Sequence, residues 1–313
     1  MLKHNSYTLY KTILLASLLL TYTSQVNANI LNGAGFYIAT GKSDITANEI
    51  VYSNNYKVSH LTWKTQNAAT SIFGIKHEIN DYMTLNFEAQ SLSQQTKSVM
   101  DDYDWLYTNT SDWSDWSHHE DTLLTQADSY TINASFTLAE NKNGYFSVIA
   151  GYKKDTRQWK SFGGSYVYSN TTFRDSSGNF TPGSAAIDYK QEYTTPYYGL
   201  DLGALFDNWL YTLQIGISNN VQLVATDVHH ARNLIFIDKF APGRMENYKL
   251  GISYFFNDNV AINFSHDLRN FIETRGNTVQ TSTVTGKVTG SCNNCAGADN
   301  SSKTSTLALS LFF

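Results

Sequence analysis

The sequence ends with Leu307-Ala308-Leu309-Ser310-Leu311-Phe312-Phe313, in which large apolar side chains alternate with small ones. The three leucines and Phe313 share one face of an extended strand, whereas Ala308 and Ser310 share the other. As the edge of a soluble sandwich, this strand would leave an apolar and unpaired end in water. We therefore predict that it closes a transmembrane β-barrel, in which one face of each strand contacts lipid.

The composition agrees with a chain that is β-structured throughout. Aromatic residues make up 14% of the sequence and charged residues 16%, and there are only three prolines. The mean hydropathy of −0.33 resembles that of a soluble protein. In a barrel this value is expected, because lipid-facing and lumen-facing residues alternate and their contributions cancel. The predicted fold class is therefore all-β.

The N-terminal segment, residues 1–28, has the features of a secretory signal peptide. Lys3 and Lys11 flank a polar start, an apolar run follows, and Val26-Asn27-Ala28 is a small-residue cleavage signal. A membrane anchor is the alternative, but the apolar run is shorter than the roughly 18 residues that a spanning helix needs. Residues 29–313 are expected to form a single β-barrel domain. Removing two lysines and no acids takes the net charge from −5 to −7, which does not suggest nucleic-acid binding.

Turn signals indicate the number of strands. Compact polar turns that join two alternating runs occur at Asn80-Asp81, 141–144, Asp207-Asn208 and 257–259. Longer polar connections lie near 101–118, 169–184, 228–243 and 280–301, with a shorter one after Gly41. Four turns and five loops connect ten antiparallel strands, with both termini on the short-turn, periplasmic side. The run from Tyr82 to Met100 is nearly twice the roughly 9–11 residues that cross a membrane, so the barrel should extend above the outer membrane.

One predicted loop, within residues 101–121, combines acids, tryptophans and histidines. The odd-numbered residues 83–89 form the lipid face of the preceding strand, so Asp102 and Asp104 should point into the barrel mouth. Two carboxylates on one face repel, and the pKa of one should rise, as general acid–base catalysis requires. A solvated surface or a loose calcium site is the alternative.

A second candidate is Asp227-Val228-His229 on the strand that starts at Trp209. An Asp two residues from a His can fix its tautomer and make it a usable base, although a surface Asp and His with no role is the alternative. The odd residues 209–217 should face lipid, and strict alternation would then turn Asp227 outward as well. We therefore predict a β-bulge between Ser218 and Asp227, near Asn219-Asn220.

Cys292 and Cys295 lie in a stretch rich in Gly, Ser and Asn, and export favours a loop-tip disulfide between them. A redox or metal-binding motif would need further ligands nearby. His118-His119 and His229-His230 raise zinc as an alternative, but we assign no metal site.

These features resemble the omptins, outer-membrane endopeptidases of Gram-negative bacteria. The resemblance covers almost the whole mature chain. Matching stretches occur in order and at matching spacings: 57–59, Trp63-Lys64, 67–69, Gly151-Tyr152, 163–166, 173–175, 189–191 and 196–200.

The resemblance implies an aspartyl-type endopeptidase at the extracellular mouth of the barrel, without a metal or organic cofactor. In that scheme, Asp102 with Asp104 and Asp227 with His229 activate a water that attacks a peptide bond. Ser117 matches a serine once suspected as a nucleophile in the family, but we expect no covalent intermediate.

The resemblance also implies cleavage beside basic residues, with Glu49 and Asp115 matching acidic groups of the cleft. Ala225 stands where the family usually has an Asp. Losing one of two acids around a basic side chain would weaken a charge-assisted contact by about 1–3 kcal/mol. A broader or weaker preference for Arg or Lys is therefore expected.

Lipopolysaccharide is the cofactor-like partner that the resemblance implies, on the outer wall of the barrel. Tyr152, Arg157 and Arg244 are the residues assigned to it, but the acid and the arginine after Tyr152 are displaced by one position. Glu192 replaces a family arginine. Dependence on lipopolysaccharide is therefore expected to be altered. The other expected partners are outer-membrane lipid and peptide or protein substrates, and the protein is expected to be a monomer. The alternative function is a non-catalytic adhesin or small channel.

Overall fold

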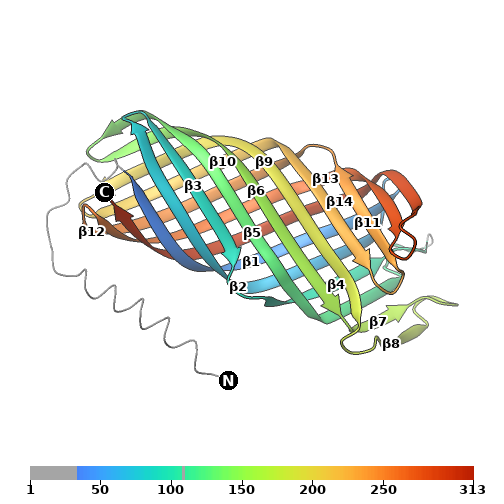
Figure 1. Ribbon diagram of the computed structural model, residues 1–313. Helices are drawn as coiled ribbons and strands as arrows, with labels where there is room; N and C mark the ends of the chain where they lie inside the picture. The colour runs from blue at the N-terminus through green and yellow to red at the C-terminus, as the bar shows by residue number, and fades with distance from the viewer. Residues whose placement is uncertain (1–33, 108–109) are drawn as a thin grey trace, which may run out of the picture.

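The computed structural model describes residues 34–107 and 110–313, and the predicted signal peptide lies outside them. These residues form one long barrel of tilted strands (Figure 1). The strands are β1 (Gly35–Ser53), β2 (Tyr56–Asn80), β3 (Met83–Leu92), β4 (Thr96–Asp104), β5 (Asp115–Asn141), β6 (Gly144–Phe162), β7 (Ser165–Tyr168), β8 (Ser176–Asn179), β9 (Ala185–Phe206), β10 (Trp209–His229), β11 (Leu234–Phe240), β12 (Gly243–Asn257), β13 (Val260–Ser282) and β14 (Val288–Phe312).

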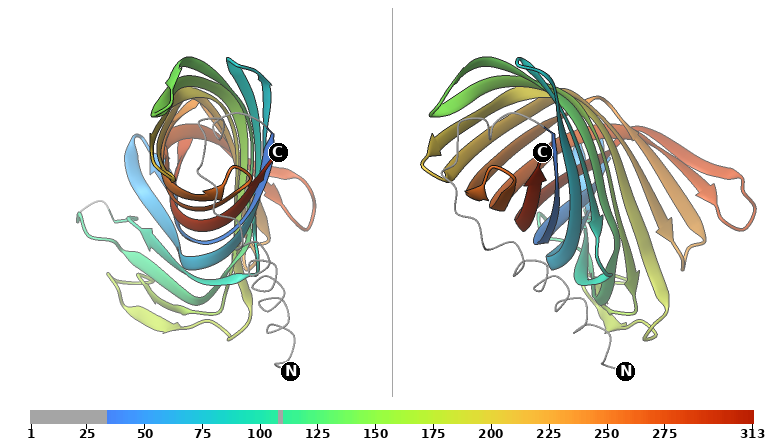
Figure 2. Two further views of the ribbon diagram at one scale, coloured as in Figure 1. Left: turned by 90° about the vertical axis from the view of Figure 1, so that its left-hand side faces the viewer. Right: turned by 60° about the vertical axis from the view of Figure 1, so that its left-hand side comes forward.

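The barrel has ten positions, as the sequence predicted. β3 and β4 occupy one position between β2 and β5, and β11 and β12 occupy another between β10 and β13, whereas β7 and β8 form a hairpin beside β5. β1 pairs with β14 in antiparallel register from Gly35 opposite Phe312 to Val51 opposite Ala296. This pairing closes the ring, which is seen end-on from the side that carries Phe313 in Figure 2. A closed ring leaves no unpaired strand edge along the wall.

All four predicted tight turns are confirmed, but the long connections are shorter than expected. Strands continue through much of the segments near 228–243 and 280–301, and β1 continues past Gly41 to a turn at Asn54-Asn55. The reason is physical: above the lipid, both faces of a strand can be polar, so a Ser- and Thr-rich composition does not identify a loop.

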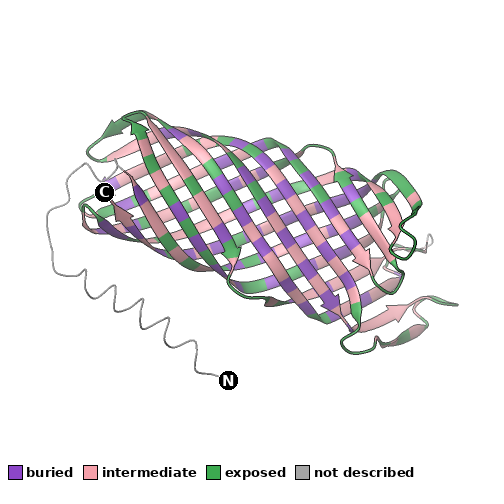
Figure 3. Cartoon of the chain, viewed as in Figure 1, coloured by how far each residue is buried: buried purple, intermediate pink, exposed green. Residues whose placement is uncertain are grey.

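The outer surface of the half that contains Gly35 and Phe313 is apolar. Side chains exposed there include Ile38, Phe73, Ile75, Phe87, Ile132, Phe136, Leu200, Tyr211, Leu250, Ile252, Phe264 and Leu307. Buried and exposed residues alternate along each strand (Figure 3), as expected where alternate side chains face the lumen. This apolar belt is the surface that contacts lipid.

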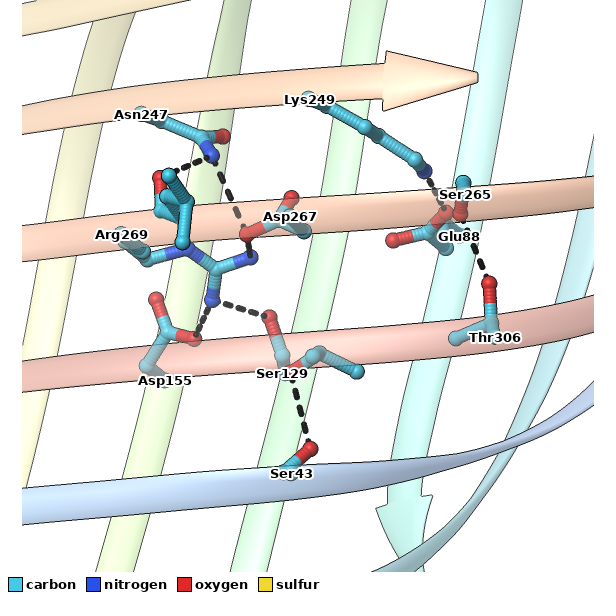
Figure 4. A network of polar contacts seen from close by, with 12 residues as sticks. Ser43, Glu88, Ser129, Asp155, Asn247, Lys249, Ser265, Asp267, Arg269 and Thr306 are labelled. Carbon is cyan, nitrogen blue, oxygen red and sulfur yellow. Dashed lines mark hydrogen bonds and ion pairs between the residues drawn. The ribbon is translucent and has the colours of Figure 1, made fainter. Parts of the chain in front are cut away.

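The lumen inside this belt is filled with paired charges (Figure 4). Arg269 donates to Asp155 over 2.7 Å, and Lys249 donates to Glu88 over 2.9 Å. Above this network, Trp63 and Trp159 pack against Tyr189 in a layer that is fully buried. The aromatic layer separates the charged lumen from the end of the barrel opposite Gly35 and Phe313.

Candidate active site

A cavity of about 510 Å³ lies at the end of the barrel opposite Gly35 and Phe313. Side chains from seven strands line it, including those of Glu49 on β1, Asp102 and Asp104 on β4, and Asp227 and His229 on β10. The structure therefore brings together the four residues that the sequence predicted to be catalytic, and one of the two predicted to bind substrate.

Asp102 and Asp104 face the cavity because they lie two residues apart on β4. Ser59 on β2 donates a hydrogen bond to Asp102 over 3.3 Å. Burial, and then the charge of Asp104, raise the pKa of Asp102 well above its ordinary value, and burial also raises the pKa of Asp104. One proton is therefore readily retained by this pair, as the sequence predicted.

The Asp227 carboxylate and the His229 ring form the opposite pair. Asp227 Oδ2 lies 2.5 Å from His229 Nε2, and the Asp227 side chain is 2% exposed. The His229 ring also packs edge-on against Phe236, with 5.2 Å between ring centroids. These contacts fix the orientation of the imidazole and leave Nδ1 as the nitrogen that can take up a proton.

The predicted bulge in β10 is present. The register against β12 shifts between Ser218 and Val221, where two residues of β10 oppose one of β12, and the register against β9 shifts at the same place. The Ser218 hydroxyl accepts a hydrogen bond from the Asn220 backbone over 3.1 Å. Below the bulge, odd residues such as Tyr211 are exposed, whereas above it Asp227 is buried. The bulge therefore turns Asp227 and His229 into the barrel.

Asp238 is an acidic residue of the cavity that the sequence analysis missed. It lies on β11, in a stretch that was expected to be loop, and its side chain points into the same cavity as Asp227. Thr278 donates a hydrogen bond to it over 2.6 Å. Burial raises the pKa of Asp238 to about 6, and Asp227 adds to the effect. The alternation of Ile235, Ile237 and Lys239 with Asp238 was the signal that could have revealed the strand.

The raised pKa of Asp238 predicts a pH-dependent stability. Between about pH 4 and 6, the folded protein holds a proton that the unfolded chain has lost, so the free energy of unfolding falls as the pH rises. We expect Asp238→Asn to match the wild type near pH 4 and to be more stable by up to about 3 kcal/mol near pH 8. Tryptophan-monitored denaturant unfolding in detergent at both pH values measures this, and a pH-independent difference would contradict it.

Asp115 and Ser117 lie beside the cavity but do not line it. The Asp115 carboxylate accepts a hydrogen bond from the Ser169 backbone over 3.0 Å and so helps to hold the β7–β8 hairpin. Ser117 is buried 3.0 Å from His119 Nε2. Ser117 and Asp115 are the direct partners of Asp102 and Asp104 in the β4–β5 ladder, so both lie on the same inner face as these two residues, at the edge of the cavity.

The three residues assigned to lipopolysaccharide do not share one face. Tyr152 and Arg244 are exposed on the outer wall, where Arg244 lies 2.5 Å from Glu246. Arg157 is 4% exposed and donates to the Asp128 carbonyl inside the barrel over 2.6 Å. The assignment of Arg157 to an outer-wall site is therefore wrong, because β6 pairs regularly between Tyr152 and Arg157 and an odd spacing reverses the face.

Cys292 and Cys295 form the predicted disulfide, but not at a loop tip. They lie within β14, where Cys292 opposes Thr278 and Ala296 opposes Gly276, so the intervening residues bulge from the ladder. Both cysteines line the cavity. Within residues 34–107 and 110–313, no group of three or more His, Cys, Asp or Glu side chains is placed to hold a metal ion.

Comparisons with known proteins agree with the barrel fold. The model of the omptin family matches residues 33–313. The chain is 27% identical over 277 residues to the plasminogen activator of Yersinia pestis, with 88% of each chain covered. It is 30% identical over 194 residues to the outer membrane protease IcsP of Shigella flexneri, with 61% of each chain covered. The fold matches the crystal structure of the outer membrane protease OmpT from Escherichia coli with a TM-score of 0.87 and 24% identity, covering 94% of this chain and 100% of that one. The chain belongs to the omptin family of outer-membrane proteases.

Proposed function

We propose that the protein is an endopeptidase that hydrolyses peptide bonds with a water held between Asp102–Asp104 and Asp227–His229. The observation that carries this proposal is that both pairs line one cavity. Each pair also acts on the other: the charge of Asp227 raises the pKa of Asp102, and that of His229 opposes the rise at Asp104. A water and a peptide carbonyl between the pairs would contact a base on one side and a shared proton on the other.

In this mechanism, His229 takes a proton from the water as the water oxygen attacks the carbonyl carbon. Asp227 stabilises the imidazolium that forms. The carboxyl group that is protonated in the Asp102–Asp104 pair donates a hydrogen bond to the carbonyl oxygen as negative charge develops there. His229 then returns its proton to the leaving amine, so that the water is divided between the two products and no bond to the protein forms.

Replacing Asp102 with asparagine tests the proposal. The change removes the shared proton but keeps the shape, so we expect kcat for a fluorogenic peptide containing arginine to fall about a hundredfold. Asp101→Asn is the matched control, because Asp101 contacts Trp116 and His118 outside the cavity. Equal activity of wild type and Asp102→Asn would overturn the mechanism.

The cavity is proposed to open on the cell surface, with the termini on the periplasmic side and peptides or proteins entering from outside. Supporting this orientation, the apolar belt lies in the half with Gly35 and Phe313 and the cavity lies beyond it. The closed ring is consistent with a protein that works as a monomer in outer-membrane lipid. Glu49 is proposed to contact a basic substrate side chain.

Lipopolysaccharide is proposed to bind the outer wall through Tyr152 and Arg244. The two are exposed on neighbouring parts of one wall, since β6, β9, β10 and β12 follow one another in the sheet. We expect activity of the refolded protein to rise when lipopolysaccharide is added, and Arg244→Ala to require several-fold more of it. Titration of activity against lipopolysaccharide measures this. Lys142→Ala, in the turn between β5 and β6, is the control. Superimposable titrations would remove Arg244 from the proposed site.

A further inference from the structure

We infer that Asp238 is a substrate-specificity residue, which supplies beside Ala225 the second carboxylate of a pocket for an arginine or lysine side chain. The inference rests on the proposed endopeptidase function. It replaces the expectation that the chain has only a weakened basic preference.

The pairing of β10 with β11 brings Asp238 next to Ala225. Ala225 and Asp238 are direct partners in this antiparallel ladder. Opposite residues of such a pair point to the same face, with their Cα atoms about 4.5–5.5 Å apart. Ala225 is fully buried and Asp238 is 5% exposed, so both point inward. The small methyl group of Ala225 leaves the space that the Asp238 carboxylate requires, and an acid is therefore present although it comes from the neighbouring strand.

The acids of this cavity lack sufficient hydrogen-bond donors. Glu49 Oε2 and Asp227 Oδ1 are buried without a hydrogen-bond partner, and the two side chains are 6% and 2% exposed. Burial, and then the charges of Asp227 and Asp238, raise the pKa of Glu49 well above its ordinary value. Without a ligand, this cluster therefore favours a shared proton over three buried negative charges.

Lys and Arg side chains offer these carboxylates little compensation. Arg232 is the only Lys or Arg that lines the cavity in residues 34–107 and 110–313. Its charge acts on Asp102 and Asp104, and it is not among the charges that shift Glu49 or Asp238. A guanidinium or ammonium group from the substrate would donate to the unpartnered oxygens and displace the shared proton. A neutral side chain cannot do this.

A pair of peptides that differ only in charge tests the inference. Citrulline has nearly the shape of arginine but no charge, so the ratio of kcat/KM for the arginine and citrulline forms reports recognition of the charge. We expect Asp238→Asn to lower this ratio about ten- to a hundredfold, mainly through the arginine peptide. Asp238→Ala removes the same charge and provides a second variant. Asp299→Asn should leave the ratio unchanged, because Asp299 lies on the outer face of the wall, where it accepts a hydrogen bond from Asn48.

Moving the charge back across the strand pair supplies the decisive comparison. Adding Ala225→Asp to Asp238→Asn should restore much of the ratio, because the carboxylate returns to the same pocket from β10. An unchanged ratio in active Asp238→Asn and Asp238→Ala would overturn the inference, and so would a loss that Ala225→Asp cannot restore. Full activity of Asp102→Asn would instead overturn the proposed endopeptidase mechanism, so the two failures are distinguishable.

Discussion

Replacing His229 with alanine is expected to lower kcat by about 10³- to 10⁴-fold while leaving the barrel folded. His229 is the only group proposed to take a proton from the water and return it to the leaving amine, so its loss removes both proton transfers. The Asp102–Asp104 pair would still polarise the carbonyl, which accounts for some residual activity. KM should change little, because the imidazole is not proposed to bind the substrate side chain. Initial rates over a range of arginine-peptide concentrations measure both quantities.

The neighbouring histidine provides a matched control. His230 follows directly in the chain but lies outside the cavity, 3.2 Å from Asp188. His230→Ala removes the same imidazole from the same turn and should retain activity within a fewfold of the wild type. If the two variants lost activity equally, disturbance of the turn would explain the loss and a base role for His229 would be rejected.

The sequence predicts the barrel well because lipid imposes a strict rule on it. Each residue of the belt must be apolar where it faces lipid, so alternation in the last strand and four compact turns were enough to predict ten positions. The rule weakens above the membrane, where water contacts the outer face. The strands through Asp238 and Cys292 were accordingly mistaken for loops, although the pairing of β11 and β14 is regular over most of their length.

The candidate site was predicted in part, and the misses have one cause. Asp102, Asp104, Asp227 and His229 belong to short motifs, so local spacing was sufficient to select them. Asp238 matters because of its partner across the ladder, and this pairing cannot be derived from local spacing. Arg157 shows the converse, since its odd spacing from Tyr152 already placed it on the inner face.

Inserting one alanine between Asn220 and Val221 is expected to abolish detectable peptidase activity, a loss of at least about 10³-fold. The bulge already contains one residue more than β9 and β12 can pair, and this residue resets the alternation of β10. A second extra residue would shift the upper part of β10 by one position, and Asp227 and His229 would turn toward the outside. Both pairs of the site would then be separated by the barrel wall. Peptide cleavage by the refolded protein measures the activity, and a shift in electrophoretic mobility on heating reports whether the barrel has formed.

Substitutions in the bulge test whether β10 requires a certain number of residues there or particular side chains. Asn219→Ala and Asn220→Ala keep the extra residue and should retain most of the activity, since the hydrogen bond at the bulge uses the backbone of Asn220. A folded insertion variant with wild-type activity would show that the register before Asp227 does not place Asp227 and His229 in the cavity. An unfolded insertion variant beside two active substitutions would still show that the count of residues, rather than the asparagine side chains, is what the strand requires. The bulge is thus the point at which the odd-numbered residues of β10 change from facing lipid to facing the inside of the barrel.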